Sequence, residues 1–248
     1  MKPGAQNRLI ILAGPSCVGK SPLAQALARL HPRLANGLQP LVLYNDRAAR
    51  PGERDGVDYH FRTREQIAAL EGEPDFVVMG VRADLQALDL GELKQLLDTG
   101  DVLFEGNPFI GRLLLGHPAL DDIPRLSVFV SPVSADEVSA WLTEGIDPRA
   151  HVTDIMRAKL LGRTRKQKGP LSQTDFEDIG IRAASAWSEL RFAHEFQHVI
   201  PNHDGEDSDH WDAEPVPLGD AGKSLETFVA LLREKPAETE HWTAHTLA

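Results

Sequence analysis

The stretch Gly14-Pro15-Ser16-Cys17-Val18-Gly19-Lys20-Ser21 decides the fold of this chain. It places a glycine, four further residues and then Gly-Lys-Ser in order, which is the spacing of a phosphate-binding loop. The apolar run 9–13 leads into it and predicts a buried parallel strand. Apolar residues at helical spacing follow from 23 to 30. Strand, loop and helix therefore come in the order that this loop requires.

The residue types within this stretch suit the binding of a nucleoside triphosphate. Glycines let the backbone N–H groups turn inward toward phosphate oxygens, and the N-terminus of the following helix adds a positive dipole end. Lys20 supplies a point charge for the β- and γ-phosphates, and the Ser21 hydroxyl suits Mg²⁺. The sequence therefore predicts ATP and Mg²⁺ as cofactors, with contacts from Gly14, Ser16, Val18, Gly19, Lys20 and Ser21.

Composition restricts the function classes. The chain has 248 residues, 42% hydrophobic and 25% charged, which is typical of a globular enzyme. Its formal net charge of −11 argues against a broad nucleic-acid-binding surface. No stretch approaches a transmembrane length, and a single cysteine suits a reducing compartment. We expect a cytoplasmic protein with no nucleic-acid or membrane partner, whereas the sequence indicates no oligomeric state.

A second anion site is predicted after the short apolar run Leu41-Val42-Leu43-Tyr44, which itself predicts a strand. Arg47 and Arg50 stand three residues apart in a turn-rich stretch that also holds two glycines and Tyr59. Arginine is suited to phosphate because its planar fork bonds two oxygens at once. The alternative is a charged surface turn without a ligand.

The phosphate loop followed by Arg-x-x-Arg-x-Gly-Glu-x-x-Gly-x-Asp-Tyr-x-Phe, here at 47–61, resembles the guanylate kinase family. The resemblance implies that Arg47, Arg50 and Tyr59 hold the phosphate of an acceptor nucleotide. It extends over about residues 8–235. It implies an α/β fold in which a parallel sheet of the phosphate-loop type is flanked by helices, with an acceptor-binding subdomain and a lid inserted.

The resemblance also implies how the chain is organised. A single domain would cover 1–248, with its core at about 8–40, 93–133 and 190–235. The acceptor-binding subdomain would cover about 41–92, the lid about 134–182, and residues 236–248 would form a flexible tail. We further expect the acidic segment 203–220 to be an exposed loop.

Several site residues follow from matching positions in the family. Glu105 and Asn107 stand where the family has two acidic residues at the end of a core strand, which implies acceptor binding for Glu105 and Mg²⁺ binding for Asn107. Asn202 ends the last core strand and would lie near the adenine. The basic lid would place arginines on the transferring phosphoryl group, as catalytic residues beside Lys20. These are Arg163, Arg165 and Arg182, for which a solvated helix face is the alternative.

Departures from the family pattern concern the base of the acceptor. The family reads guanine with a serine and a glutamate, whose positions fall here on Leu43 and Val78, and a Tyr-Gly-Ser/Thr turn is replaced by residues 86–88. Asp84 or Asp89 could substitute. GMP is the leading acceptor by resemblance. The alternatives are a kinase of another acceptor, such as a sugar phosphate in the manner of ribose bisphosphate kinases, or a catalytically silent protein-binding module.

A competing motif lies at His194-Glu195-Phe196-Gln197-His198, which fits the His-Glu-x-x-His signature of zinc proteases. On a helix the two histidines would share a face and could bind Zn²⁺. The predicted core strand beginning at His198 would break that spacing, so we favour the kinase interpretation and expect surface histidines here.

Overall fold

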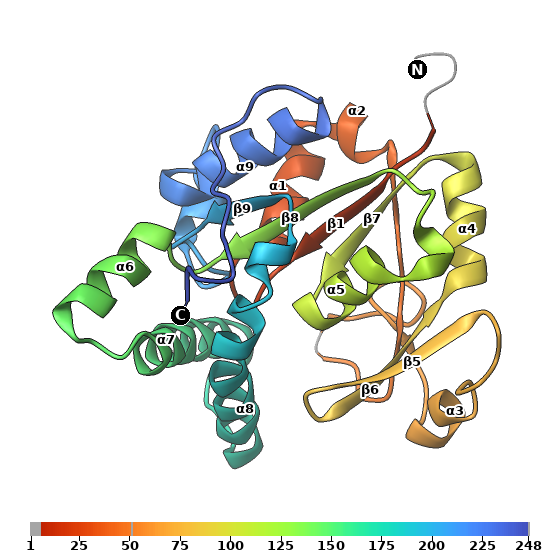
Figure 1. Ribbon diagram of the computed structural model, residues 1–248. Helices are drawn as coiled ribbons and strands as arrows, with labels where there is room; N and C mark the ends of the chain where they lie inside the picture. The colour runs from red at the N-terminus through yellow and green to blue at the C-terminus, as the bar shows by residue number, and fades with distance from the viewer. Residues whose placement is uncertain (1–5, 51, 248) are drawn as a thin grey trace.

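A five-stranded parallel sheet forms the centre of the protein (Figure 1). The structure, a computed structural model, describes residues 6–50 and 52–247. The central strand leads into the phosphate loop, so both neighbouring strands end close to that loop. The strand order is β2 (Leu38–Pro40), β7 (Asp101–Gly106), β1 (Leu9–Ala13), β8 (Arg125–Ser131) and β9 (His198–Pro201).

Helices cover both faces of this sheet because β1 is apolar on both sides. Alternate side chains of a strand point to opposite faces. Ile10 and Leu12 join a cluster with α1 (Lys20–Leu30) and α9 (Gly219–Leu232). Leu9 and Ile11 join the other cluster, with α4 (Leu90–Thr99) and α5 (Pro108–Gly116). The predicted α/β fold with a flanked parallel sheet is confirmed.

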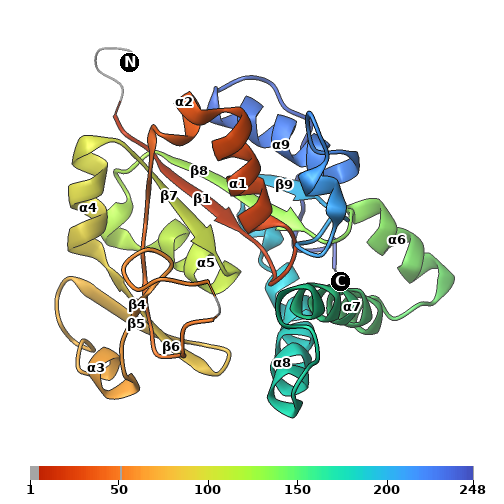
Figure 2. The ribbon, with the colours of Figure 1, turned by 180° about the vertical axis from the view of Figure 1, so that it is seen from behind.

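A second, smaller sheet stands beside the first (Figure 2). Its order is β4 (His60–Phe61), β3 (Tyr44–Asn45), β6 (Asp84–Asp89) and β5 (Phe76–Val81), with β5 and β6 antiparallel. Short helix α3 (Arg64–Ala68) begins at a capping box in which the Thr63 hydroxyl accepts from the Gln66 N–H. Residues 41–43, expected to be strand, instead carry the chain from one sheet to the other.

Three helices follow β8: α6 (Ala135–Glu144), α7 (Pro148–Lys168) and α8 (Gln173–Leu190). α7 and α8 pack as a hairpin, with the buried residues of both facing the larger core cluster. None of the described helices is long and apolar enough to cross a bilayer. Shorter helical segments are α2 (Pro32–Ala35), η1 (Pro118–Leu120), η2 (Ala193–Glu195) and η3 (Asp209–Asp212).

The structure corrects the flexible tail expected after residue 236. The backbones of Glu240 and Val199 exchange hydrogen bonds of 2.8 and 2.9 Å, which adds a bridge to the edge of β9. Trp242 is 6% exposed and belongs to the core cluster, and its indole N–H donates to Glu240 at 2.5 Å. A single aromatic residue without periodic apolar neighbours gives no sequence signal for such docking.

Truncating this anchor should destabilise the whole chain. We expect Trp242→Ala to lower the free energy of unfolding by about 3 kcal/mol, since a buried aromatic side chain is lost. Denaturant unfolding followed by circular dichroism measures this. His245→Ala, which alters an exposed residue of the same segment, should change it by less than ~0.5 kcal/mol. Equal effects of both variants would contradict a docked tail.

Candidate active site

The phosphate loop turns between β1 and α1 through two left-handed residues, Cys17 (φ 70°) and Gly19 (φ 101°). Only glycine adopts this conformation without steric cost, so Cys17 carries some strain. A side chain at Gly19 would also approach Asn202 Nδ2 to 2.5 Å. At Gly14 it would approach the Val130 carbonyl oxygen to 2.4 Å. Both loop glycines are therefore required by close packing.

Lys20 lies buried at the start of α1. Its ammonium donates to two carbonyls of its own loop, Gly14 O at 3.0 Å and Pro15 O at 2.8 Å. Burial lowers the pKa of Lys20, and the nearby carboxylates of Glu206 and Glu105 oppose that shift. The charge is thus held inside the loop, where phosphate oxygens would replace the carbonyls.

A cation site fits the end of β7. The Ser21 hydroxyl donates to Glu105 Oε1 at 2.7 Å, and burial raises the pKa of Glu105 while Lys20 opposes that shift. Mg²⁺ prefers oxygen ligands and is usually held by one or two carboxylates together with substrate phosphates. Ser21 and Glu105 meet that description. In the described part of the chain no group of three or more histidine, cysteine or acidic residues could hold a metal alone.

The arginine loop is held together by Glu53. Arg47 donates to both carboxylate oxygens of Glu53, at 2.6 and 2.7 Å, and the Arg50 backbone N–H donates to the same group at 2.7 Å. The Arg47 guanidinium also lies 5.0 Å from the centre of the Tyr59 ring. Arg50 itself keeps about a third of its side chain exposed, 3.8 Å from Glu53. One arginine is therefore fixed and the other is available to a ligand.

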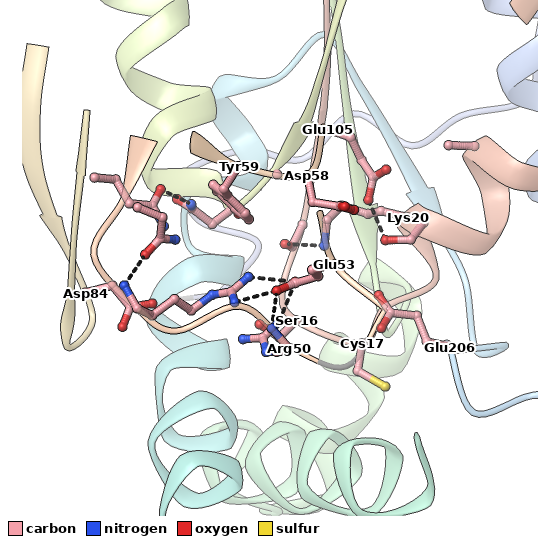
Figure 3. A pocket seen from close by; sticks show the side chains of 18 of the residues that line it. Ser16, Cys17, Lys20, Arg50, Glu53, Asp58, Tyr59, Asp84, Glu105 and Glu206 are labelled. Carbon is pink, nitrogen blue, oxygen red and sulfur yellow. Dashed lines mark hydrogen bonds and ion pairs between the residues drawn. The ribbon is translucent and has the colours of Figure 1, made fainter. Parts of the chain in front are cut away.

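Both predicted anion sites open into one cavity of about 410 Å³. Figure 3 shows Lys20 and Glu105 on one side of it, Asp84 on the other and Glu53 between them. Most sequence-predicted site residues line this cavity; they are Gly14, Ser16, Lys20, Ser21, Arg47, Arg50, Tyr59, Glu105, Asn107, Arg163 and Arg182. Cationic and hydrogen-bonding side chains from three separate regions of the chain thus meet in one place.

The lid arginines divide into two groups. Arg163 and Arg182 line the cavity, whereas Arg165 is exposed on α7 and lies outside the lining. Arg163 donates to Glu206 at 2.8 Å. Arg182 and Arg47 line the same cavity, and burial together with the charge of Arg47 lowers the pKa of Arg182.

Two of the predicted ligand residues also make structural contacts. Asn202 is fully buried and its amide nitrogen donates to the carbonyls of Val18 and Asp204, each at 2.8 Å, which leaves no donor for an adenine. Asn107 lines the cavity and also caps α5, where its side-chain oxygen accepts from the Ile110 N–H at 3.0 Å. Val18 and Gly19 take part through the shape of the loop and lie outside the cavity lining.

Segment 203–220 is only in part the exposed acidic loop that its composition predicts. Its first residues pack on the phosphate loop, where the Glu206 N–H donates to Cys17 O at 3.3 Å, and Trp211 is 4% exposed. This places the Glu206 carboxylate in the cavity beside Arg163. Burial raises the pKa of the Cys17 thiol to about 12, and the charge of Glu206 adds to that rise. The thiol is therefore an unreactive packing group.

No local sequence pattern indicates the buried ion pair between Arg82 and Glu189. Arg82 occupies the turn between β5 and β6 with φ 57°, and it donates through Nε (2.8 Å) and a terminal nitrogen (2.5 Å) to one oxygen of Glu189 on α8. Ser185 donates to the same oxygen at 2.6 Å. The pair joins the small sheet to α8 at the edge of the cavity, across 107 residues of chain.

The zinc-protease interpretation is excluded by geometry. His194 and Glu195 belong to the short helix η2, whereas His198 begins β9, so the two histidines share no helical face. Glu195 instead pairs with Arg112 at 2.8 Å.

Removing one member of the buried pair should be costly. We expect Arg82→Leu to lower the free energy of unfolding by about 3 kcal/mol, since it leaves the fully buried Glu189 carboxylate without a counter-charge. The double variant Arg82→Leu/Glu189→Leu should recover most of that loss in denaturant titrations.

The matched control is Arg157→Leu, which breaks the exposed pair with Asp154 and should cost less than ~1 kcal/mol. A cost at Arg82 no larger than this would show that the buried pair is energetically unimportant.

Comparisons with known proteins agree with this site. The family model described as Guanylate kinase matches residues 6–84. The guanylate kinase of Corynebacterium diphtheriae is 30% identical over 81% of this chain and 89% of that protein, and a Synechococcus guanylate kinase is 44% identical over 76% and 82%. The crystal structure of guanylate kinase from Anaplasma phagocytophilum, 17% identical, shares the fold with a TM-score of 0.53 over 92% of this chain and 85% of that one. The chain therefore belongs to the guanylate kinase family of ATP-dependent kinases.

Proposed function

We propose that the protein transfers the γ-phosphoryl group of ATP, with Mg²⁺, to the phosphate of a small phosphorylated acceptor, with GMP as the leading candidate. One observation carries this proposal. The phosphate loop with Lys20 and the loop with Arg47 and Arg50 line the same cavity, so donor and acceptor phosphates would meet within it.

On the donor side, Lys20 would exchange its two loop carbonyls for β- and γ-phosphate oxygens. Ser21 and Glu105 would hold the cation, directly or through its water. Mg²⁺, when bound, neutralises phosphate charge and aligns the transferring group. The amide of Asn202 is already committed, so contacts to the adenine must come from other residues.

On the acceptor side, Glu53 orients Arg47 in advance, so binding a phosphate costs less side-chain entropy. Arg50 and the Tyr59 hydroxyl complete the grip. Arg163 and Arg182 would neutralise the charge on the phosphoryl group in transit, because catalysis of this transfer consists mainly of positioning and charge stabilisation. Arg163 must exchange Glu206 for phosphate during this process.

The partner proposed here is a small molecule, with no nucleic acid involved. The cytoplasm is the expected location, and a single buried thiol is compatible with it. The alternative of a catalytically silent module is disfavoured because Lys20 and Ser21 are both in place in the loop.

Loss of the loop charge should abolish transfer. We expect Lys20→Ala to lower turnover by at least ~100-fold in a coupled assay of ADP release, and omission of Mg²⁺ to do the same. Lys94→Ala, on the exposed face of α4, should keep full activity. A folded Lys20→Ala protein with normal turnover would disprove the phosphate-loop assignment.

Arg50 should contribute to the binding of every acceptor, because it is proposed to contact the phosphate that all of them share. Arg50→Ala should raise the acceptor KM by at least ~10-fold, since a charge-assisted bond to phosphate is lost, and leave the ATP KM within ~2-fold. Arg54→Ala changes an exposed arginine of the same loop that lies outside the cavity and should have little effect. An ATP KM that rises as much as the acceptor KM would move Arg50 to the donor side.

A further inference from the structure

The side chain of Asn45 lines the cavity, and its amide nitrogen has no hydrogen-bond partner in the part of the chain that the structure describes. Its side chain is 1% exposed and lines the cavity floor formed by the small sheet. Oδ1 accepts from the Arg47 N–H at 3.0 Å, which fixes the amide orientation and leaves the nitrogen as its free end. Nδ2 has no acceptor among the described residues. A buried amide donor without a partner is costly, so a ligand atom is the natural acceptor.

Gln86 lies directly opposite Asn45 in the antiparallel pairing of β3 and β6. Residues opposite each other in such a pair have side chains on the same face of the sheet. Gln86 is 3% exposed and also lines the cavity. Its Oε1 accepts from Asn107 Nδ2 at 3.3 Å, and its Nε2 has no acceptor within the described parts of the chain. The small sheet therefore presents two amide donors side by side.

The two positions at which the family binds guanine, here Leu43 and Val78, offer no polar contact to a base in this chain. Leu43 is 3% exposed and belongs to the apolar core, and Val78 pairs with Ala87, one residue out of step with Gln86. Neither lines the cavity. The only polar contacts for a base on this part of the described sheet come from Asn45, Gln86 and the half-buried Asp84.

We propose, building on the kinase function above, that Asn45 Nδ2 and Gln86 Nε2 read the base of the acceptor by donating to two neighbouring acceptor atoms. The acceptor class is then a 6-oxopurine nucleoside monophosphate. Guanine and hypoxanthine present O6 and N7 side by side as acceptors, whereas adenine presents N7 beside an amino donor. Arg47, two residues after Asn45, holds the phosphate of the same molecule.

Binding of IMP and AMP tests this directly, because the two differ only at the 6-position and the adjoining N1. Isothermal titration with the full chain should give IMP an advantage of about 10-fold or more, the range of a two-bond base contact. Asn45→Asp and Gln86→Glu keep the oxygens that bond Arg47 and Asn107 and turn each donor into an acceptor. Each should reduce the ratio of AMP to IMP dissociation constants by at least ~10-fold.

The negative charge that each variant adds repels the phosphate of AMP and the phosphate of IMP equally. The ratio of the two dissociation constants therefore reports on the base contact alone. Val78→Thr, outside the cavity, should leave the ratio within ~2-fold. Circular dichroism checks folding, and Gln86→Glu decides the matter if Asn45→Asp is unfolded. The proposal is overturned if wild type binds AMP or ribose 5-phosphate as tightly as IMP, or if the folded variants keep the wild-type ratio.

Because binding is measured without ATP, the two proposals fail separately. IMP-selective binding without any phosphoryl transfer would refute the kinase function and uphold this base contact. Transfer restricted to a sugar phosphate would uphold a kinase and overturn the base contact.

Discussion

The tight turn of the phosphate loop is the constraint on which the rest of the structure depends. Two left-handed residues, Cys17 and Gly19, leave the loop backbone open, and the chain from Asn202 to Glu206 packs against it through the carbonyls of Val18 and Cys17. A loop of this shape needs a neighbour to satisfy those carbonyls. The 202–206 segment therefore serves as a support, and that position brings Glu206 into the cavity.

Charge inside the cavity is balanced by pairing rather than by solvent. Among the described residues that line it, two arginines face carboxylates, Arg47 with Glu53 and Arg163 with Glu206, whereas the Lys20 ammonium donates to carbonyls of its own loop. Collecting so much positive charge would be unfavourable without these partners. In the proposed function, phosphates exchange with these carboxylates as partners of the two arginines. Glu53 is part of the family-like pattern, whereas Glu206 comes from the acidic segment.

Features that depend on neighbours in the sequence could be predicted, and those that depend on distant contacts could not. The phosphate loop and the capping box at Thr63 follow local spacing rules, and the structure places the loop between a buried strand and a helix as expected. The pairing of Arg82 with Glu189 and the docking of Trp242 join residues far apart in the chain, so no local sequence pattern predicts them. The predicted exposure of the acidic segment 203–220 is inaccurate for a related reason. Composition indicates solvent exposure on average, and it does not show that Glu206 pairs with the largely buried Arg163.

The base contact shows how a register can carry specificity. Side chains alternate between the faces of a strand, so slipping β6 by one residue against β3 would turn Gln86 away from the cavity and bring Ala87 into its place. The register is fixed by the buried apolar residues Ala87 and Leu88 and by Asp46, which accepts from the Leu85 N–H at 2.8 Å. Replacement of a family serine and glutamate by Leu43 and Val78 thus need not cost the pocket its polar contacts. An amide pair on another part of the same small sheet supplies them, and it favours acceptor atoms where a carboxylate would favour donors.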